Sequence, residues 1–301
     1  MKICHYDRNQ VGIVEGEKVF PIGQALVKAK HLKSGYTMLD VVEALANKPG
    51  AMKGVRDAVR VGSPVALASV KLLAPILNPP SFWAAAANYK DHQAEMRVQS
   101  GSEDRSKLSK DDLMAEFFLK PTSSIIGPGG TVVLPKISID VDFECELCAV
   151  IGRTARHVTE DQALDYVFGY TICWDFSQRD PWGRGRQNTR NIRKGFDTFA
   201  GLGPWIVTRD EIPDPHVLQV RTILNGKEMQ NSNTKNLIFN VNKIIAYASQ
   251  GTTLEPGDLI PTGTPFGVGF SRKPPVFLQD GDMCECEVEK VGKISNKIRQ
   301  K

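Results

Sequence analysis

Long apolar runs are missing from this sequence. No stretch approaches the roughly 18 uninterrupted apolar residues that a membrane-spanning helix needs, and the opening segment MKICHYDRNQ lacks the apolar centre of a secretion signal. An excess of charge is also missing, since the net charge is only +4 and basic residues are interspersed with acids. These absences argue against a membrane protein and against nucleic-acid binding, and they favour a globular protein of the cytoplasm.

Cysteine is sparse, with residues at positions 4, 145, 148, 173, 284 and 286. In a chain of 301 residues without a secretion signal, we expect all of them to be free thiols. Cys145 and Cys148, taken with Cys284 and Cys286, resemble a thiolate zinc set. Strand alternation would send Cys145 and Cys148 to opposite faces, however. We therefore expect no disulfide and no zinc site, and we interpret these cysteines as packing residues.

Prolines divide the chain near residue 77. Residues 1–77 combine strand-like segments at 11–14 and 18–21 with a helical pattern around 38–45, and the proline-rich stretch 75–80 interrupts regular structure. We predict a small N-terminal α+β domain over 1–77 and a larger domain over 78–301.

Strands predominate in the larger domain. Turn signals stand at 127–130, at 225–226 and at 281–282. One helix is expected between Thr159 and Gly169, and another over 241–250 behind the capping residue Asn240. Strands and helices alternate too irregularly for a doubly wound sheet, so we predict a mixed, strand-rich α/β fold of the barrel or rolled-sandwich type.

A pair of carboxylates lies on a predicted strand, in the segment VDFECELCAVI at 141–151. Side-chain alternation places Glu144 and Glu146 on one face of this strand. Like charges so close need bulk water or a cation, and a solvated surface strand explains the pair alone. A second apolar strand ends at Asp175 and supplies a third carboxylate. Three oxygen ligands without histidine favour Mg²⁺ or Mn²⁺, with Ca²⁺ as the alternative.

Nine sequence blocks between about residues 82 and 296 resemble, in order, those of the fumarylacetoacetate hydrolase family. They are NYKDHQAE at 88–95, FLKP at 118–121, DFECEL at 142–147, FGY at 168–170, DFSQRD at 175–180, KGFDT at 194–198, GP at 203–204, LEPGD at 254–258 and TGTP at 262–265. The resemblance implies a C-terminal mixed β-sandwich roll, a homodimer, and metal ligands at Glu144, Glu146 and Asp175. It also implies a small keto-acid substrate that chelates the metal.

The same resemblance implies that His92 and Glu95 activate a water molecule, which attacks a carbonyl and cleaves the adjacent C–C bond. A histidine and a glutamate three residues apart meet only where the chain turns helically, and such a pair alone is commonly a surface stabiliser. Lys194 matches the family's active-site lysine, which neutralises a developing enolate or holds the substrate carboxylate.

Four further residues are the expected substrate contacts: Tyr89, Arg179, Trp182 and Thr264. Arg179 suits carboxylate recognition, although a structural ion pair with neighbouring acids is the alternative. Trp182 stands where family members that cleave fumarylacetoacetate or acylpyruvates carry a glutamine. Thr264 follows a glycine, which allows the chain to approach a ligand closely.

Two polar stretches flank these candidates. The segment 97–112 has the composition of a loop that orders over bound substrate as a lid. The basic run 183–193 is typical of a solvated loop, or of a surface that attracts an anionic substrate.

Together with the carboxylate triad, the resemblance implies a metal-dependent hydrolase that cleaves a C–C bond in an acylpyruvate or related β-diketo acid, as in aromatic catabolism, and in which residues 78–301 form the catalytic domain. The same site would also suit decarboxylation of oxaloacetate or keto–enol isomerisation of a hydroxydienedioate. A catalytically silent member that only binds a keto acid is the alternative of another class.

Overall fold

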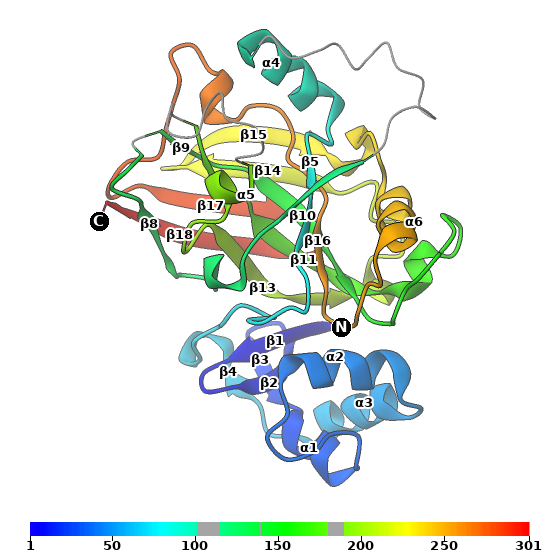
Figure 1. Cartoon of the computed structure of the whole chain (residues 1–301). Helices are drawn as coiled ribbons and strands as arrows, with labels where there is room; N and C mark the ends of the chain where they lie inside the picture. Colours follow the sequence, from blue (N-terminus) through cyan, green and yellow to red (C-terminus); the bar gives the residue numbers. More distant parts are fainter. Residues whose placement is uncertain (101–114, 139, 180–189, 301) are drawn as a thin grey trace.

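Two β-sheets packed face to face form the centre of the molecule (Figure 1), as seen in a computed structural model that describes residues 1–100, 115–138, 140–179 and 190–300, with 97–100 as backbone only. The larger, nine-stranded sheet has the order β16-β10-β11-β13-β1-β2-β3-β4, and β7 pairs with β13 in parallel. Its strands are β1 Lys2–Tyr6, β2 Gln10–Glu15, β3 Lys18–Pro21, β4 Val65–Ala66, β7 Ile125–Ile126, β10 Cys145–Ile151, β11 Val167–Trp174, β13 Ala200–Thr208 and β16 Leu259–Pro261.

The second sheet has the order β15-β14-β17-β18-β8 and covers one face of the first. Its strands are β8 Thr131–Leu134, β14 Gln219–Leu224, β15 Lys227–Asn233, β17 Met283–Val288 and β18 Gly292–Gln300. Two small ribbons complete the strands, β5 Trp83–Ala86 with β6 Glu116–Leu119 and β9 Val141–Asp142 with β12 Ser177–Gln178. The predicted strand-rich, mixed α/β class is confirmed, and the sheets form no closed barrel in the described part of the chain.

The N-terminal strands continue the larger sheet, because β1 pairs with β13 through Lys2 and Val207. Helices α1 Gly23–Lys28, α2 Met38–Asn47 and α3 Ala51–Val61 lie together at this end of the molecule (Figure 1). The predicted segments 11–14, 18–21 and 38–45 fall within β2, β3 and α2. The domain boundary at residue 77 stays a prediction.

Local signals placed one helix correctly and one wrongly. Asn240 caps α6 Val241–Gly251 by accepting the backbone N–H of Lys243 at 2.8 Å, as predicted. Between Thr159 and Gly169, however, the chain forms only a short 3₁₀ turn, Ala163–Tyr166, and then enters β11. The cause is that β11 is buried along its whole length, from Val167 to Trp174, so strand pairing takes the last three residues of the expected helix.

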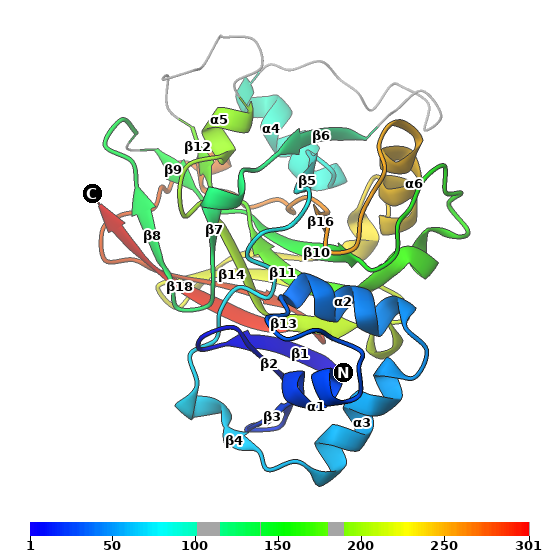
Figure 2. The same cartoon turned by 60° about the horizontal axis from the view of Figure 1, so that its bottom comes forward.

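The other helices are α4 Lys90–Ser100 and α5 Arg190–Lys194, which lie at the end opposite the N-terminal helices (Figure 2). The predicted turn at Asn225 and Gly226 joins β14 to β15, and both residues have positive φ, at 51° and 79°. Within the described residues, no helix has the length and apolar character needed to cross a membrane.

The expectation of six free thiols is wrong. Cys145 on β10 forms a disulfide with Cys286 on β17, with the Cα atoms 5.4 Å apart. Both side chains are fully buried where the two sheets meet, and packing brings together strands that are 141 residues apart. Alternation did separate Cys145 from Cys148, which lie in different core clusters on the two faces of β10.

Candidate active site

A cavity of about 520 Å³ lies between α4, α5, β6 and the end of β10. Six residues predicted from the sequence line it: His92, Glu144, Glu146, Arg179, Lys194 and Thr264. The rest of the lining combines apolar residues, which are the three alanines at 85–87, Met96, Phe118 and Phe270, with the polar residues Ser177, Gln178, Arg190 and Arg193. Six of the sequence-derived candidates therefore converge on one cavity.

Strand register gathers the three carboxylates. Cys145 and Glu146 of β10 pair with Trp174 and Cys173 of β11, so Asp175 emerges beside Glu144. The backbone N–H of Asp175 donates to the carbonyl of Glu144 at 2.9 Å. One oxygen from each of Glu144, Glu146 and Asp175 lies within 4.8 Å of the others, and all three side chains are buried.

Buried cations surround this triad. Lys194 donates to Glu144 at 2.7 Å and also to Asp175, while Lys120 donates to Asp175 at 2.7 Å. Arg179 donates to Glu144 and, at 3.0 Å, to Asp142. Burial alone would raise the pKa of Glu144, but the positive charges of Lys194 and Arg179 outweigh it and hold the pKa well below its ordinary value.

The pKa of Glu146 is shifted in the opposite direction to that of Glu144. Burial, reinforced by Asp175 and Glu144, raises the pKa of Glu146 well above its ordinary value. The backbone N–H of Gly263 donates to its carboxylate at 2.8 Å. The charges of the buried cluster are carried by carboxylates at Asp142, Glu144, Glu146 and Asp175 and by cations at Lys120, Arg179 and Lys194.

The donor set fits a divalent cation. If all four buried carboxylates were ionised, the three buried cations would leave one negative charge uncompensated, and the raised pKa of Glu146 reflects that excess. The triad offers only hard oxygen ligands, the type that Mg²⁺, Mn²⁺ and Ca²⁺ prefer. A divalent ion at the triad would also relieve the repulsion that acts on Glu146.

A histidine–glutamate pair lies on α4, and His92 of this pair lines the cavity. Nδ1 of His92 is 2.7 Å from Glu95, so the helical turn does bring the two together. The other oxygen of Glu95 accepts the backbone N–H of Gly267 at 2.9 Å and the hydroxyl of Ser271 at 2.5 Å. Burial would raise the pKa of Glu95, but the hydrogen bonds from His92, Ser271 and Gly267 outweigh it and lower the pKa.

Comparisons with known proteins show the family of this chain. Residues 81–299 match the family described as fumarylacetoacetate (FAA) hydrolase C-terminal. The chain belongs to the fumarylacetoacetate hydrolase family. A mitochondrial oxaloacetate tautomerase of Xenopus laevis is 43% identical over 230 residues, which cover 76% of this chain and 69% of the relative.

Two further relatives of this family match along nearly the whole chain. Maleylpyruvate hydrolase of Aquipseudomonas alcaligenes is 36% identical over 99% of both chains. The crystal structure of maleylpyruvate hydrolase from Sphingobium sp. SYK-6, in complex with manganese(II) and pyruvate, superposes with a TM-score of 0.80 at 30% identity, covering 100% of this chain and 99% of that one. The relatives are thus enzymes, and one was solved with a divalent metal.

The remaining predicted substrate contacts divide into three cases. Thr264 lines the cavity and donates to the carbonyl of Cys145 at 3.1 Å. Tyr89 is fully buried instead, and burial followed by the charge of Glu146 raises the pKa of its phenol. Trp182, residues 101–112 of the expected lid and residues 183–189 of the basic run lie outside the described residues.

Other residues of the site were not assigned a role from the sequence. Lys120 lies in the family block FLKP and is buried against Asp175. Its position between apolar residues was the feature of the sequence that could have indicated this burial. Asp142, at the start of the DFECEL block, accepts from Arg179 and from the backbone N–H of Gly269 at 2.7 Å. Arg190 and Arg193 line the cavity from α5. Both belong to the basic run 183–193, for which the sequence indicated only a solvated loop or a surface that attracts an anionic substrate.

Proposed function

We propose that this chain is a divalent-metal-dependent hydrolase that cleaves a C–C bond in an acylpyruvate or a related β-diketo acid. The observation that carries the proposal is that His92, paired with Glu95, lines the same cavity as Glu144 and Glu146, and that Asp175 joins these two glutamates in a buried carboxylate triad. A water-activating pair beside an oxygen-rich metal site is the combination that such a hydrolysis needs.

Glu95 orients the base in this proposal. Its carboxylate is fixed by Gly267 and Ser271 and holds Nδ1 of His92, which leaves Nε2 of the ring to receive a proton from water. The water oxygen bonds to the substrate carbonyl carbon, and the adjacent C–C bond breaks. The carbon that leaves with the electron pair then takes up the proton that His92 had accepted. Atoms and charge are conserved through these steps.

Glu144, Glu146 and Asp175 would hold the metal. A divalent ion there supplies Lewis-acid polarisation of the keto and carboxylate oxygens when it is bound. Mg²⁺ and Mn²⁺ are the candidates, with Ca²⁺ as the third. Lys194 and Arg179 keep the carboxylates oriented through their own hydrogen bonds and add positive charge beside the developing enolate.

Keto–enol tautomerisation of oxaloacetate is the second candidate. Its support is the 43% identity to an oxaloacetate tautomerase, together with a base that can move a proton at carbon without any attack by water. Decarboxylation of oxaloacetate and isomerisation of a hydroxydienedioate would use the same carboxylates and cations.

The test is a panel of acetylpyruvate, maleylpyruvate, oxaloacetate and a hydroxydienedioate, assayed with added Mg²⁺ or Mn²⁺. Hydrolysis is followed by release of pyruvate from acetylpyruvate and maleylpyruvate, decarboxylation by release of pyruvate from oxaloacetate, and tautomerisation by the enol absorbance. We expect hydrolysis in the wild-type protein and its loss in His92→Ala, while Mn²⁺ binding measured by calorimetry is retained. Asn47→Ala, on the distant helix α2, is a control. Tautomerisation without any pyruvate release would contradict the hydrolase assignment.

A further inference from the structure

Helix α5 presents three cations on one face. Residues spaced i, i+3 and i+4 share a face of a helix, which groups Arg190, Arg193 and Lys194, and all three line the 520 Å³ cavity. Asn191 and Ile192 between them line a different surface groove instead. The cationic face of α5 is therefore turned toward the candidate active site.

From this geometry we propose that Arg190 and Arg193 bind a second carboxylate at the far end of the substrate, which makes the site selective for dicarboxylic 2-oxo acids. The inference rests on the proposed function for the other end of the substrate, where the 2-oxo acid group meets the metal site. It assigns a charge-recognition role to two residues outside the catalytic pair and the metal ligands.

The cations closest to the triad are already engaged. Lys194 donates to Glu144 and Asp175, and Arg179 donates to Glu144 and Asp142. Their positive charge offsets these buried carboxylates. A second carboxylate on the substrate therefore needs a separate receptor.

Distance supports the assignment. Arg190 and Lys194 are four residues apart on α5, which is about 6 Å along the helix axis. That span is comparable to the separation of the two carboxylates in a five-carbon diacid. The wall beside it is apolar, with Phe118 and the alanines at 85–87, and suits the carbon chain that joins the two ends.

The existing partner of Arg190 does not prevent substrate binding. Arg190 pairs with Glu116 of β6, and the two side chains are 33% and 41% exposed, so the pair lies in contact with solvent. A guanidinium carries five N–H donors in a planar fork, so it can keep Glu116 and still bind a carboxylate. Arginine also binds carboxylates in two-point geometry, which lysine cannot reproduce.

The experiment compares two unreactive probes of equal length. 2-Oxoglutarate carries a distal carboxylate and 2-oxopentanoate does not, and both lack the β-diketo bond that is cleaved. Their affinities are measured by calorimetry in the presence of Mn²⁺. We expect the wild-type protein to bind 2-oxoglutarate at least about tenfold more tightly, as charge-assisted hydrogen bonds to one carboxylate would give.

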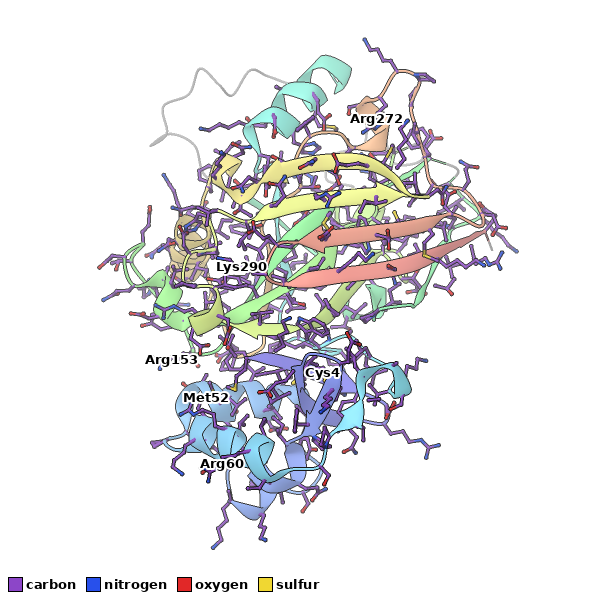
Figure 3. All side chains as sticks on the ribbon, turned by 180° about the vertical axis from the view of Figure 1, so that it is seen from behind. Cys4, Met52, Arg60, Arg153, Arg272 and Lys290 are labelled. Carbon is purple, nitrogen blue, oxygen red and sulfur yellow. A yellow bond between two sulfur atoms is a disulfide. The ribbon has the colours of Figure 1, made fainter. Side chains whose placement is uncertain are left out.

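The double variant Arg190→Gln/Arg193→Gln should abolish this preference and bring the affinity ratio close to one. Arg153→Gln/Arg156→Gln is the charge-matched control, because both arginines are exposed in the loop that follows β10 and neither lines the cavity. Figure 3 shows Arg153 at the end of the larger sheet that adjoins the N-terminal helices, away from α4. The control should keep the wild-type ratio. Retention of the preference in the Arg190/Arg193 variant would overturn the assignment.

The wild-type measurement also separates the two proposals. Equal affinity for the two probes would overturn the arginine subsite and leave the hydrolase proposal standing. If neither probe bound in the presence of Mn²⁺, the proposed 2-oxo acid site itself would be contradicted. A preference for 2-oxoglutarate in a protein that hydrolyses no acylpyruvate would support the subsite and contradict the hydrolase.

Discussion

Removing the disulfide between Cys145 and Cys286 should weaken the fold substantially. The double variant Cys145→Ala/Cys286→Ala opens a cross-link between residues 141 apart in sequence. In the chain-entropy description, a closed loop of that length stabilises the folded state by about 5 kcal/mol. Because Cys145 stands between Glu144 and Glu146, we also expect weaker Mn²⁺ binding by the double variant.

The assay is equilibrium unfolding in guanidinium chloride, followed by circular dichroism and by tryptophan fluorescence. Cys284→Ala is the matched control, because Cys284 is a free, fully buried cysteine on the same strand as Cys286. It reports the loss of a buried thiol without a cross-link, on the order of 1 kcal/mol. If the double variant lost no more stability than two such truncations, the disulfide would not contribute to stability as reasoned.

Three other predictions concern single residues. Asn240→Ala should cost about 1 kcal/mol in urea unfolding, because it removes the cap of α6. Ser271→Ala should lower kcat about tenfold with little change in KM, because Glu95 loses a hydrogen bond, and Ser271→Thr should restore the rate. Burial raises the pKa of Asp258 to about 6, so the folded protein binds this proton more tightly than the unfolded chain. The unfolding free energy should therefore contain a contribution that falls as the pH rises from about 4 to about 6, and Asp258→Asn should remove it.

Features set by neighbouring residues were predictable from the sequence. The cap at Asn240 and the turn at Asn225 and Gly226 depend on residues a few positions apart, and both formed as predicted. The carboxylate triad also followed, because strand alternation and the family's motif order pointed to the same residues. Its geometry depends on the register between β10 and β11, which the sequence does not specify.

Features set by long-range packing were not predictable in the same way. The Cys145–Cys286 bond depends on how the two sheets face each other, and cysteine count with chain length carries no such information. The expected helix after Thr159 failed because strand pairing outweighed a local capping signal. The role of Lys120 emerged only once β6 was placed beside Asp175. The predicted homodimer and cytoplasmic location stay predictions.

The central claim is that a divalent ion held by Glu144, Glu146 and Asp175 is required for C–C bond hydrolysis. The most direct measurement is the rate of pyruvate release from an acylpyruvate by protein stripped with a chelator and then titrated with Mn²⁺, with Glu146→Gln treated in parallel. We predict no turnover in the stripped protein, recovery at one equivalent of Mn²⁺, and no recovery in the variant. Undiminished turnover after the metal has been removed would contradict the account.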